Sequence, residues 1–302
     1  MVRILATDGI ESSAAKALTD LGFEVVQQFY DESELPGRAA EYDVVVVRSA
    51  TKIRKPVIDE AAKAGKLKLI IRGGVGIDNI DAAYAKEKGI DVQNTPMASS
   101  ASVAELVIAH ILSLARFIYA ANITMREGKW EKKRYEGIEI AGKTLGIIGM
   151  GRIGRQVARK ASALGMNVIY FDPKGATANN APFEYFPLND LFAKSDFISL
   201  HATKKDGPVI TADAIAKMKD GVYFINTARA ALVDTQALLR ALDSGKIAAV
   251  ALDVFDEEPI KDPAIYTHPK ISMTPHIGAS TVEAQLRIGE NIVEIISEKF
   301  KK

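Results

Sequence analysis

Three short segments carry side chains whose types could do chemistry. I-N-T-A-R at 225–229 ends in an arginine, A-L-D-V-F-D-E-E-P at 251–259 holds several acids, and M-T-P-H at 273–276 ends in a histidine. Each segment follows a short apolar, β-branched run that is typical of a strand. Because ligands of open α/β sheets bind beyond the carboxyl ends of the strands, we expect the three segments to lie together.

A guanidinium, a carboxylate and an imidazole are the groups needed to oxidise a 2-hydroxy acid. His276 suits the base that takes the hydroxyl proton, since imidazoles titrate near neutral pH. Arg229 suits the substrate carboxylate, because its guanidinium offers two parallel N–H donors. A neighbouring carboxylate would orient the imidazole, and the residues alone leave Asp256, Glu257 and Glu258 as alternatives.

Each of these assignments has a structural alternative. Arg229 could form an ion pair, the acids could lie in a solvated loop, and His276 could be a turn residue after Pro275. The presence of all three groups at strand ends, beside a dinucleotide motif, favours a catalytic site.

The remaining histidines are expected to be structural. His110 lies in an apolar helical pattern and is interpreted as a core residue, while His268 precedes a proline in a surface loop. His201 ends the strand F-I-S-L-H and is expected to line the cofactor site without doing chemistry. No spacing of His, Asp and Glu suggests a metal site, and hydride transfer to a nicotinamide needs none.

The glycine-rich segment at 149–154 predicts a dinucleotide site. Gly149, Gly151 and Gly154 form G-x-G-x-x-G between an apolar strand and a helix, and a second strand ends on Asp172, 18 residues beyond Gly154. Gly149 allows the tight turn, Gly151 lets a pyrophosphate approach the backbone, and Gly154 lets helix and strand pack closely.

The residues around these glycines complete the predicted site. Free N–H groups at Arg152 and Ile153 open the helix and face the anion. Asp172 should accept hydrogen bonds from the ribose hydroxyls and repel a 2′-phosphate, which favours NAD over NADP, although the nearby Lys174 weakens that preference. A second glycine segment, G-G-V-G at 73–76, lacks an acid at the end of the next strand. We therefore interpret it as a loop of the outer domain that faces the cleft.

The elements that must position these residues alternate along the chain. Strand-like runs and helical patterns follow one another, which predicts βαβ units and parallel sheets. The strands are expected at 2–7, 23–27, 43–49, 67–72, 90–93, 143–149, 167–172, 196–201, 222–226, 247–252 and 270–274. The series restarts at Lys143, so the predicted fold class is α/β with two doubly wound parallel sheets.

Two helical patterns connect these sheets. An apolar pattern at 103–121 predicts one long buried helix, and the last helix covers about 280–300. Residues 1–98 and 279–302 would then form a flavodoxin-like substrate-binding domain, with a Rossmann NAD-binding domain of residues 99–278 inserted in it. Shorter helices are expected at 11–21, 55–64, 81–88, 152–165, 187–194, 211–219 and 234–244.

The composition is that of a globular protein. The chain has 302 residues, 48% hydrophobic and 25% charged, which suggests about two domains. A net charge of +1 gives no field that would attract nucleic acid or a membrane surface. The absence of cysteine excludes disulfides and thiolate chemistry. With no signal-peptide pattern and no apolar run of about 18 residues, a cytoplasmic location is expected.

Beyond these motifs, the sequence resembles the D-2-hydroxyacid dehydrogenase family over nearly its whole length. The segments that carry the resemblance are V-R-S-A-T-K at 47–52, R-G-G-V-G-I-D-N-I-D at 72–81, N-T-P at 94–96, G-K-W-E-K-K at 128–133, G-M-G-R-I-G at 149–154, N-T-A-R at 226–229, L-D-V-F-D-E-E-P at 252–259 and P-H-I-G-A-S-T at 275–281. The amino-terminal segments and the last one look most like D-3-phosphoglycerate dehydrogenases, in a short form without the regulatory domain.

The resemblance implies roles for individual residues. Arg229, Glu258 and His276 would be the catalytic trio, and Glu258 is selected among the three acids because it directly precedes Pro259. Asp253 would bind the nicotinamide carboxamide. The residues expected to contact NAD are Val75, Gly149, Gly151, Arg152, Ile153, Gly154, Asp172, His201, Ala202, Thr227, Ala228, Arg229, Asp253, His276, Gly278 and Ala279.

The resemblance also implies a substrate and a partner. The substrate would be 3-phosphoglycerate, whose phosphate needs cations beyond Arg229. The residues expected to bind it are Arg48, Arg72, Gly73, Gly74, Val75, Lys132, Arg229 and His276, with Lys133 as a further candidate. A solvated basic surface is the alternative for the lysines. Relatives of this kind are homodimers that swap the long helix after Asn94.

Two other functions stay open. Glyoxylate, hydroxypyruvate and D-lactate reductases share the scaffold and need no cations for a phosphate. Some relatives are NAD-sensing corepressors, a binding function that predicts exposed peptide-binding surfaces.

One departure from the family pattern is Ala230-Ala231, in place of Gly-Gly after the catalytic arginine. Because two Cβ atoms exclude strongly positive φ, we expect a different or strained turn there.

Overall fold

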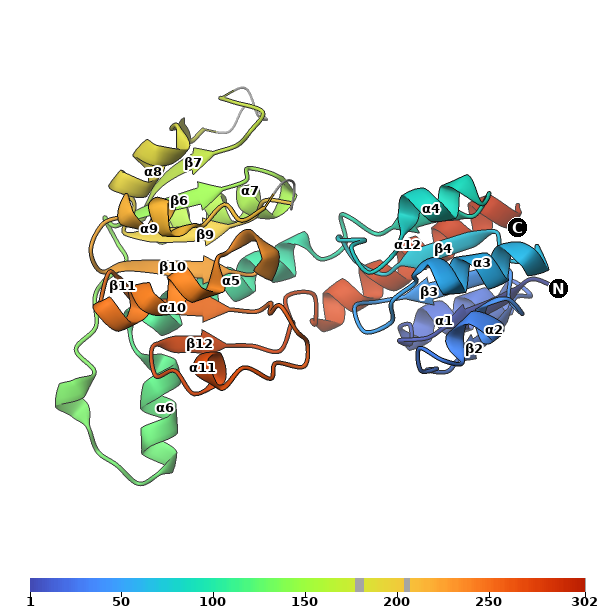
Figure 1. The fold of residues 1–302 in the computed structure, drawn as a ribbon, viewed down its shortest axis with the longest axis horizontal. Helices are drawn as coiled ribbons and strands as arrows, with labels where there is room; N and C mark the ends of the chain where they lie inside the picture. The colour runs from blue at the N-terminus through green and yellow to red at the C-terminus, as the bar shows by residue number, and fades with distance from the viewer. Residues whose placement is uncertain (177–181, 204–206, 302) are drawn as a thin grey trace. The chain divides into compact units, whose positions relative to one another are not determined.

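The computed structural model describes residues 1–176, 182–203 and 207–301, which form two compact units. Met1–Ser99 and Ala279–Lys302 form the first, which we call the terminal unit because it contains both ends of the chain. Ser100–Gly278 form the second, which we call the central unit. Figure 1 shows helices packed around a sheet in each unit.

A sheet of five parallel strands builds the described part of the terminal unit. The strands are β1 Arg3–Ala6, β2 Glu24–Gln27, β3 Val44–Val47, β4 Leu69–Arg72 and β5 Asp91–Asn94. Their order across the sheet is β2-β1-β3-β4-β5, which is the doubly wound order of flavodoxin-like folds. The central strand β3 consists of four buried valines, because a parallel strand with helices on both faces has no polar side.

Helices cover both faces of this sheet. They are α1 Ser12–Asp20, α2 Leu35–Ala39, α3 Lys55–Ala64, α4 Ala82–Glu87 and α12 Val282–Phe300. One apolar cluster joins α2, α3 and α4 to the sheet, and another joins α1 and α12 through residues such as Leu18 and Ile292. The sequence did not predict α2, since Leu-Pro-Gly-Arg-Ala is short and contains two weak helix formers.

In the described residues, the central unit is built on seven parallel strands. They are β6 Thr144–Ile148, β7 Asn167–Phe171, β8 Glu184–Tyr185, β9 Phe197–Leu200, β10 Val222–Asn226, β11 Ile247–Leu252 and β12 Ile271–Met273. Their order is β12-β11-β10-β9-β6-β7-β8, so the direction of winding reverses between β6 and β9. Open α/β sheets bind ligands at such a switch point. The two sheets confirm the predicted fold class.

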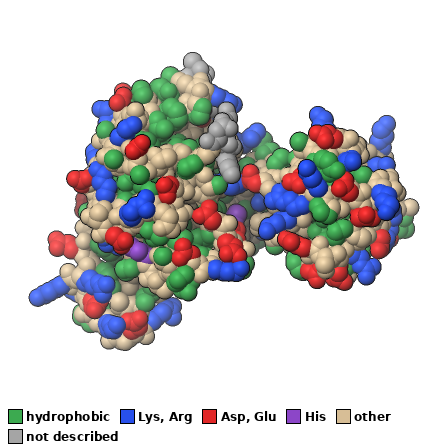
Figure 2. Space-filling view, in the orientation of Figure 1, with side chains coloured by type: hydrophobic (Ala, Val, Ile, Leu, Met, Phe, Trp, Pro, Cys, Tyr) green, Lys and Arg blue, Asp and Glu red, His purple; other side chains and the backbone are tan. Residues whose placement is uncertain are grey.

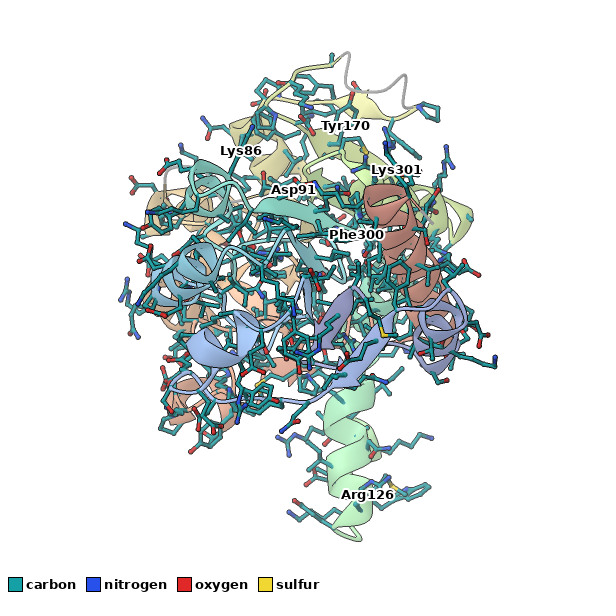
Figure 3. The ribbon with its side chains drawn as sticks, turned by 90° about the vertical axis from the view of Figure 1, so that its right-hand side faces the viewer. Lys86, Asp91, Arg126, Tyr170, Phe300 and Lys301 are labelled. Carbon is teal, nitrogen blue, oxygen red and sulfur yellow. The ribbon has the colours of Figure 1, made fainter. Side chains whose placement is uncertain are left out.

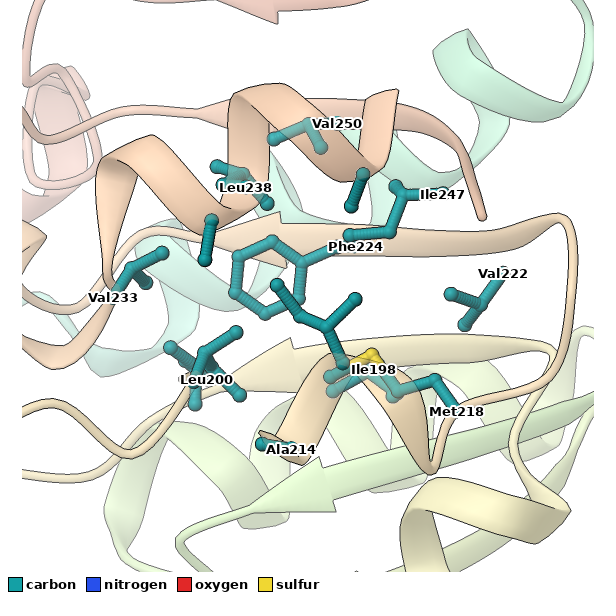
Figure 4. Packing of buried hydrophobic residues seen from close by; sticks show 14 of the residues in the cluster. Ile198, Leu200, Ala214, Met218, Val222, Phe224, Val233, Leu238, Ile247 and Val250 are labelled. Carbon is teal, nitrogen blue, oxygen red and sulfur yellow. The ribbon is translucent and has the colours of Figure 1, made fainter. Parts of the chain in front are cut away.

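The helices of the central unit again form two layers. They are α5 Ser100–Ala115, α6 Ile118–Arg126, α7 Arg152–Ala163, α8 Leu188–Lys194, α9 Ala212–Ala216, α10 Thr235–Ser244 and α11 Pro263–Tyr266, with 3₁₀ turns η1 Lys132–Arg134 and η3 Ala230–Leu232. α5 and α7 bury residues on one face of the sheet, and α8, α9 and α10 on the other. Figure 4 shows the second layer, where the ring of Phe224 from β10 lies among Ile198, Val233 and Leu238.

The apolar pattern at 103–121 does not form one helix, so that prediction was wrong. α5 ends at Ala115 and α6 begins at Ile118, with Phe117 between them at a left-handed φ of 54°. The two helices are bent by 67°. α6 has no buried residue, and its far end projects from the rest of the central unit in Figures 1 and 3. Over the described ranges, no single helix is long and apolar enough to cross a membrane.

Candidate active site

The loop between β6 and α7 is shaped by its three glycines. Gly149 has a φ of 101°, and a Cβ there would lie 2.7 Å from the backbone of His201. A Cβ on Gly154 would lie 2.1 Å from the carbonyl oxygen of Gly149. A Cβ on Gly151 would meet nothing within 4 Å. Two glycines therefore close the loop tightly, and the third leaves open space beside the start of α7.

The carboxylate of Asp172 ties the end of β7 to this loop. Its Oδ2 accepts a hydrogen bond from the N–H of Met150 at 2.9 Å, and its Oδ1 accepts one from the N–H of Lys174 at 2.9 Å. A carboxylate has about four acceptor positions, so both oxygens can still accept a hydroxyl group. The backbone thus holds an acceptor for ribose next to the glycine loop.

The ends of β9 and β10 add polar groups to the same edge of the sheet. Thr227, directly after β10, has a buried hydroxyl oxygen without a hydrogen-bond partner among the described residues. His201, directly after β9, pairs its Nε2 with Ser199 Oγ at 2.9 Å, and burial lowers its pKa to about 3. The imidazole is therefore neutral at physiological pH.

These features fit a dinucleotide. The first N–H groups of α7 have no side-chain cap, so they and the helix dipole can receive a pyrophosphate. The buried hydroxyl of Thr227 needs a partner, because an unsatisfied buried hydroxyl costs about 1–3 kcal/mol. The residues expected to contact NAD that lie in the central unit are Gly149, Gly151, Arg152, Ile153, Gly154, Asp172, His201, Ala202, Thr227, Ala228, Arg229, Asp253, His276 and Gly278. Val75 and Ala279 belong to the terminal unit.

At the same edge of the sheet, His276 and Glu258 form a hydrogen-bonded pair. The Nδ1 of His276 lies 2.8 Å from Oε2 of Glu258, although 18 residues separate them in sequence. Burial alone would raise the pKa of Glu258, but the hydrogen bond and charge of His276, the N–H of Phe255 and the charge of Arg229 bring it below its ordinary value. Glu258 is therefore ionised and accepts from Nδ1, which leaves Nε2 of His276 for a substrate.

The other two acids of the run are engaged elsewhere. Asp256 accepts a hydrogen bond from Thr235 Oγ1 at 3.0 Å, and Glu257 pairs with Lys261. Among these three acids, the structure thus joins Glu258 to the histidine. The residue types alone did not separate them, because adjacent residues of an irregular loop have no fixed facing, and the choice of Glu258 came from the family resemblance.

Arg229 follows β10 and is held by a buried asparagine that the sequence analysis did not single out. Asn226 donates from Nδ2 to the carbonyl of Arg229 at 2.9 Å and accepts from the N–H of Ala228 at 2.9 Å. The next residues, Ala230 and Ala231, start the 3₁₀ turn η3, and neither has a positive φ. The turn therefore differs from one that requires glycine. An asparagine at the end of an apolar strand is the signal that could have revealed this clamp.

The turn that carries His276 is clamped from β11. Asp253, 1% exposed, accepts hydrogen bonds from the N–H of Ile277 at 2.8 Å and of Gly278 at 2.9 Å. His276 itself has a φ of 53°, a left-handed conformation that is uncommon for residues with a Cβ. The clamp therefore holds the imidazole in a backbone conformation that it would rarely adopt alone.

In the terminal unit, the glycine loop after β4 is covered by an arginine. Gly74 has a φ of 148°, and a Cβ there would lie 1.4 Å from Nη1 of Arg72. Asn94 donates from Nδ2 to the carbonyl of Val75 at 2.5 Å, which fixes the other side of the loop. Arg72, Gly73, Gly74 and Val75 thus form one cluster, with the guanidinium lying over the glycine backbone.

Arg48 lies at the neighbouring strand end. Asp8 accepts hydrogen bonds from the N–H groups of Arg48 at 2.6 Å and Thr51 at 3.1 Å, and so holds this loop to the end of β1. The side chain of Arg48 lines a surface pocket of about 460 Å³ with Glu11 and the first residues of α12. Arg48 and Arg72 thus both lie at the carboxyl edge of the sheet.

Lys132 is placed differently. It lies in η1, beyond the protruding helix α6, and is exposed. No contact joins it to Arg229 or His276 among the described residues, so its role and that of Lys133 stay predictions.

On the face that Figure 2 shows, basic and acidic side chains are interspersed. Across the described ranges, no group of three or more His, Asp or Glu could hold a metal ion.

Comparisons with known proteins identify the family of the chain. The family model of the D-isomer specific 2-hydroxyacid dehydrogenase, NAD binding domain, matches residues 108–278. A hydroxypyruvate reductase of Thermotoga maritima is 46% identical over 99% of this chain and 98% of that protein.

The chain belongs to the D-isomer specific 2-hydroxyacid dehydrogenases.

This family membership identifies the cofactor. The matched segment is the NAD-binding domain of these dehydrogenases, and it contains the glycine loop, Asp172 and His276. The cofactor is therefore NAD, and the protein is an oxidoreductase of this family.

Other 2-hydroxyacid dehydrogenases are similar to the chain but differ in substrate. A D-3-phosphoglycerate dehydrogenase of Methanocaldococcus jannaschii is 46% identical over the whole chain, which spans 57% of that protein. The crystal structure of a glyoxylate reductase from Paecilomyes thermophila is 33% identical, with a TM-score of 0.87 over 98% of this chain and 94% of that one.

Proposed function

We propose that the chain oxidises 3-phospho-D-glycerate to 3-phosphohydroxypyruvate with NAD, the first step of serine synthesis. The observation that carries the proposal is the hydrogen bond of 2.8 Å between His276 Nδ1 and Glu258 Oε2, with the charge of Arg229 acting on the same carboxylate. This arrangement supplies the base, its orienting partner and a cation.

Each residue has a defined part in the reaction. As hydride leaves C2 of the substrate, the proton of the C2 hydroxyl passes to Nε2 of His276. NAD, when bound, supplies the acceptor for the hydride. Glu258 stabilises the imidazolium at Nδ1, and Arg229 holds the C1 carboxylate through paired N–H donors. In the reverse direction the imidazolium returns the proton to the ketone oxygen.

The terminal unit supports a phosphorylated substrate. Arg48 and Arg72 lie at adjacent strand ends, and the pocket beside Arg48 also receives the start of α12, a long helix whose dipole favours an anion. Glu11 lines the same pocket, and hydrogen bonds from Ser13, Ser12 and the start of α1 lower the pKa of its carboxyl, which keeps it ionised. The proposal therefore rests on the guanidinium of Arg48 in this pocket and on that of Arg72 at the next strand end, which suit a phosphate better than a methyl or hydroxymethyl group.

Hydroxypyruvate reduction is the second candidate. The reductase of Thermotoga maritima is as similar in sequence as the phosphoglycerate dehydrogenase of Methanocaldococcus jannaschii, and the chain covers 98% of its length. The same three residues would serve this reaction, which requires no phosphate site. The two candidates therefore differ in what Arg48 and Arg72 contact.

We further propose that the chain acts as a homodimer through α6 and the residues after it. Ile118, Ile123, Met125 and Trp130 are each more than half exposed, and Trp130 is 79% exposed. Apolar side chains concentrated on one protruding element are typical of an interface. Light scattering on a size-exclusion column should give about twice the chain's 32.7 kDa, and Ile123→Glu should lower it to one copy.

The proposed substrate is tested by following reduced nicotinamide at 340 nm. The protein would be assayed with NAD and 3-phosphoglycerate, D-glycerate, glycolate or D-lactate, and with NADH and hydroxypyruvate or glyoxylate. We expect 3-phosphoglycerate to give the highest kcat/KM, with Arg229→Ala lowering it by about 100-fold or more. Arg48→Gln should raise KM for 3-phosphoglycerate and leave that for D-glycerate unchanged.

The other outcomes lead to different conclusions. Turnover of unphosphorylated acids alone, insensitive to Arg48→Gln, would replace the proposed substrate by hydroxypyruvate or glyoxylate. Binding of NAD without turnover of any acid would contradict both candidates.

A further inference from the structure

A second histidine lies buried beneath the turn that carries His276. His110 is on α5 and is 4% exposed, and its Nε2 lies 3.2 Å from Oγ1 of Thr274. Val103, on the same face of α5, approaches the other end of that turn, since a Cβ on Gly278 would lie 3.3 Å from it. α5 therefore supports both ends of the turn. The sequence indicated only a core residue at position 110, and this contact gives it a specific partner.

The hydrogen bonds around Thr274 have a defined direction. The carboxylate of Asp253 accepts from Ile277 N–H at Oδ1 and from Gly278 N–H at Oδ2, and Thr274 Oγ1 donates to Oδ1 at 2.6 Å. A threonine hydroxyl has one hydrogen, so Thr274 can only accept from His110. Burial lowers the pKa of His110, against the opposing charge of Asp253, so the imidazole is neutral and carries its one proton on Nε2.

The chain of contacts ends on the backbone around His276. Asp253 accepts from the two N–H groups that follow His276, and the N–H of His276 donates to the carbonyl of Thr274 at 3.0 Å. These bonds hold a residue whose φ is 53°, and they aim its Nδ1 at Glu258. An unrestrained hydroxyl at Thr274 could rotate away from Asp253 and release one side of the clamp.

We propose that His110 is a positioning residue for His276. Its Nε2–H holds the hydroxyl of Thr274 toward Asp253, and Asp253 then fixes the left-handed turn that presents the imidazole to Glu258 and to substrate. The catalytic consequence rests on the proposed function of His276 as the base. The structural consequence, a clamp on the turn, does not depend on it.

The kinetic test compares variants that keep or remove the donor. His110→Leu removes the N–H and keeps an apolar side chain of similar size, while His110→Gln restores an N–H. With 3-phosphoglycerate and NAD, or hydroxypyruvate and NADH, we expect His110→Leu to lower kcat by roughly 10- to 100-fold, with KM for the acid changed less than about twofold. His110→Gln should recover most of the loss. His268→Leu, a histidine variant elsewhere in the central unit, should leave kcat unchanged.

A double-mutant cycle separates positioning from general destabilisation. Thr274→Val removes the hydroxyl at nearly constant volume, and we expect it to lower kcat at least as much as His110→Leu. The double variant should then be no slower than Thr274→Val alone, because both changes break one chain of contacts. Multiplicative losses, or equal losses in His110→Leu and His110→Gln, would overturn the proposal. If His110→Leu fails to fold, His110→Met against His110→Gln makes the same comparison of an N–H donor absent and present.

Hydrogen exchange tests the clamp without any turnover. The amide protons of Ile277 and Gly278 should exchange at least about tenfold faster in His110→Leu than in the original protein, while amides of β6 stay unchanged. Faster exchange without activity toward any acid would support the clamp and reject the proposed reaction. Unchanged exchange would reject the clamp, whatever the activity.

Discussion

The two units of this dehydrogenase each place a glycine-rich loop at the end of a strand, and the two loops use their glycines differently. In the central unit, the loop leads directly into α7, and the space beside Gly151 is open. In the terminal unit, the loop of Gly73 and Gly74 is filled by the protein's own arginine, with Arg72 over Gly74.

This difference shows that a glycine motif alone does not define a ligand. A Cβ at Gly151 would meet only open space, whereas Gly74 has no Cβ because Arg72 and a φ of 148° require it. The central loop also has Asp172 bonded to it, while the terminal loop is fixed by the amide of Asn94. The first loop therefore leaves room for a ligand at the start of α7, and the second is filled by an arginine of the protein.

The largest effect is expected at the glycine that closes the central loop. Gly154→Ala would place a Cβ 2.1 Å from a backbone oxygen, which cannot move without breaking the turn. We expect the free energy of unfolding in urea to fall by about 3 kcal/mol or more. Gly151→Ala, where the Cβ meets open space, should stay within about 0.5 kcal/mol of the original protein. Equal losses in the two variants would mean that both glycines serve packing.

Gly151→Ala should instead weaken cofactor binding. Its methyl group occupies the space that the pyrophosphate would use, so we expect the Kd for NADH, measured by fluorescence, to rise by about 10- to 100-fold. Gly37→Ala, at an open position in α2, is the control and should leave the Kd for NADH unchanged. Gly165→Ala cannot serve as a control, because Gly165 has a positive φ. An unaltered Kd in Gly151→Ala would place the pyrophosphate elsewhere.

Gly74→Ala should separate the two loops functionally. The new methyl group would displace Arg72 from the terminal loop, so we expect KM for the acid substrate to rise about tenfold while the Kd for NADH is unchanged. Arg72→Gln should raise KM in the same sense without straining the backbone. A change in NADH affinity in either variant would show that the terminal loop also serves the cofactor.

The smallest effect concerns the histidine whose backbone closes on Gly149. Burial lowers the pKa of His201 to about 3 in the folded chain. Between about pH 6.5 and 3, the imidazole is therefore protonated in the unfolded chain and neutral in the folded chain. Stability contributed by the neutral form is complete above about pH 6.5 and is lost as the pH falls. We expect a loss of about 1 kcal/mol in the free energy of unfolding between about pH 7 and 5.5.

His201→Gln provides the control for this pH effect. The variant should lose less stability over the same interval, because its amide does not titrate. Identical slopes against pH in urea titrations of both proteins would assign the acid sensitivity to other groups.

Much of the fold could be predicted because periodicity and strand composition are local properties. The apolar strands and the restart of the series at Lys143 were sufficient for two doubly wound sheets. The break at Phe117 could not be predicted, since α5 and α6 are both apolar and hydropathy does not record a single left-handed residue. α2 was missed because its Pro and Gly weaken the helical pattern.

The site was predictable where strand ends determine position. His276, Arg229 and an acid of residues 256–258 were expected together because each segment follows a strand of one sheet. The family resemblance selected Glu258 among the acids, and the structure joins it to His276. Side-chain direction was not predictable. Nothing local shows that Arg72 folds over Gly74, or that His110 meets Thr274, 164 positions further along the chain. The catalytic and binding roles of these residues stay predictions until the variants are measured.

The division of the terminal unit between the two ends of the chain has a consequence during translation. Ile288 and Ile292 of α12 complete one side of the core of the terminal unit. The ribosome makes them only after residues 100–278. At the usual speed of a ribosome, that interval lasts roughly 10–40 s. During that time the nascent amino-terminal strands expose the surface that α12 will cover, whereas the continuous central unit is complete before α12 is made. Newly made terminal units are therefore the state most open to chaperones and to aggregation.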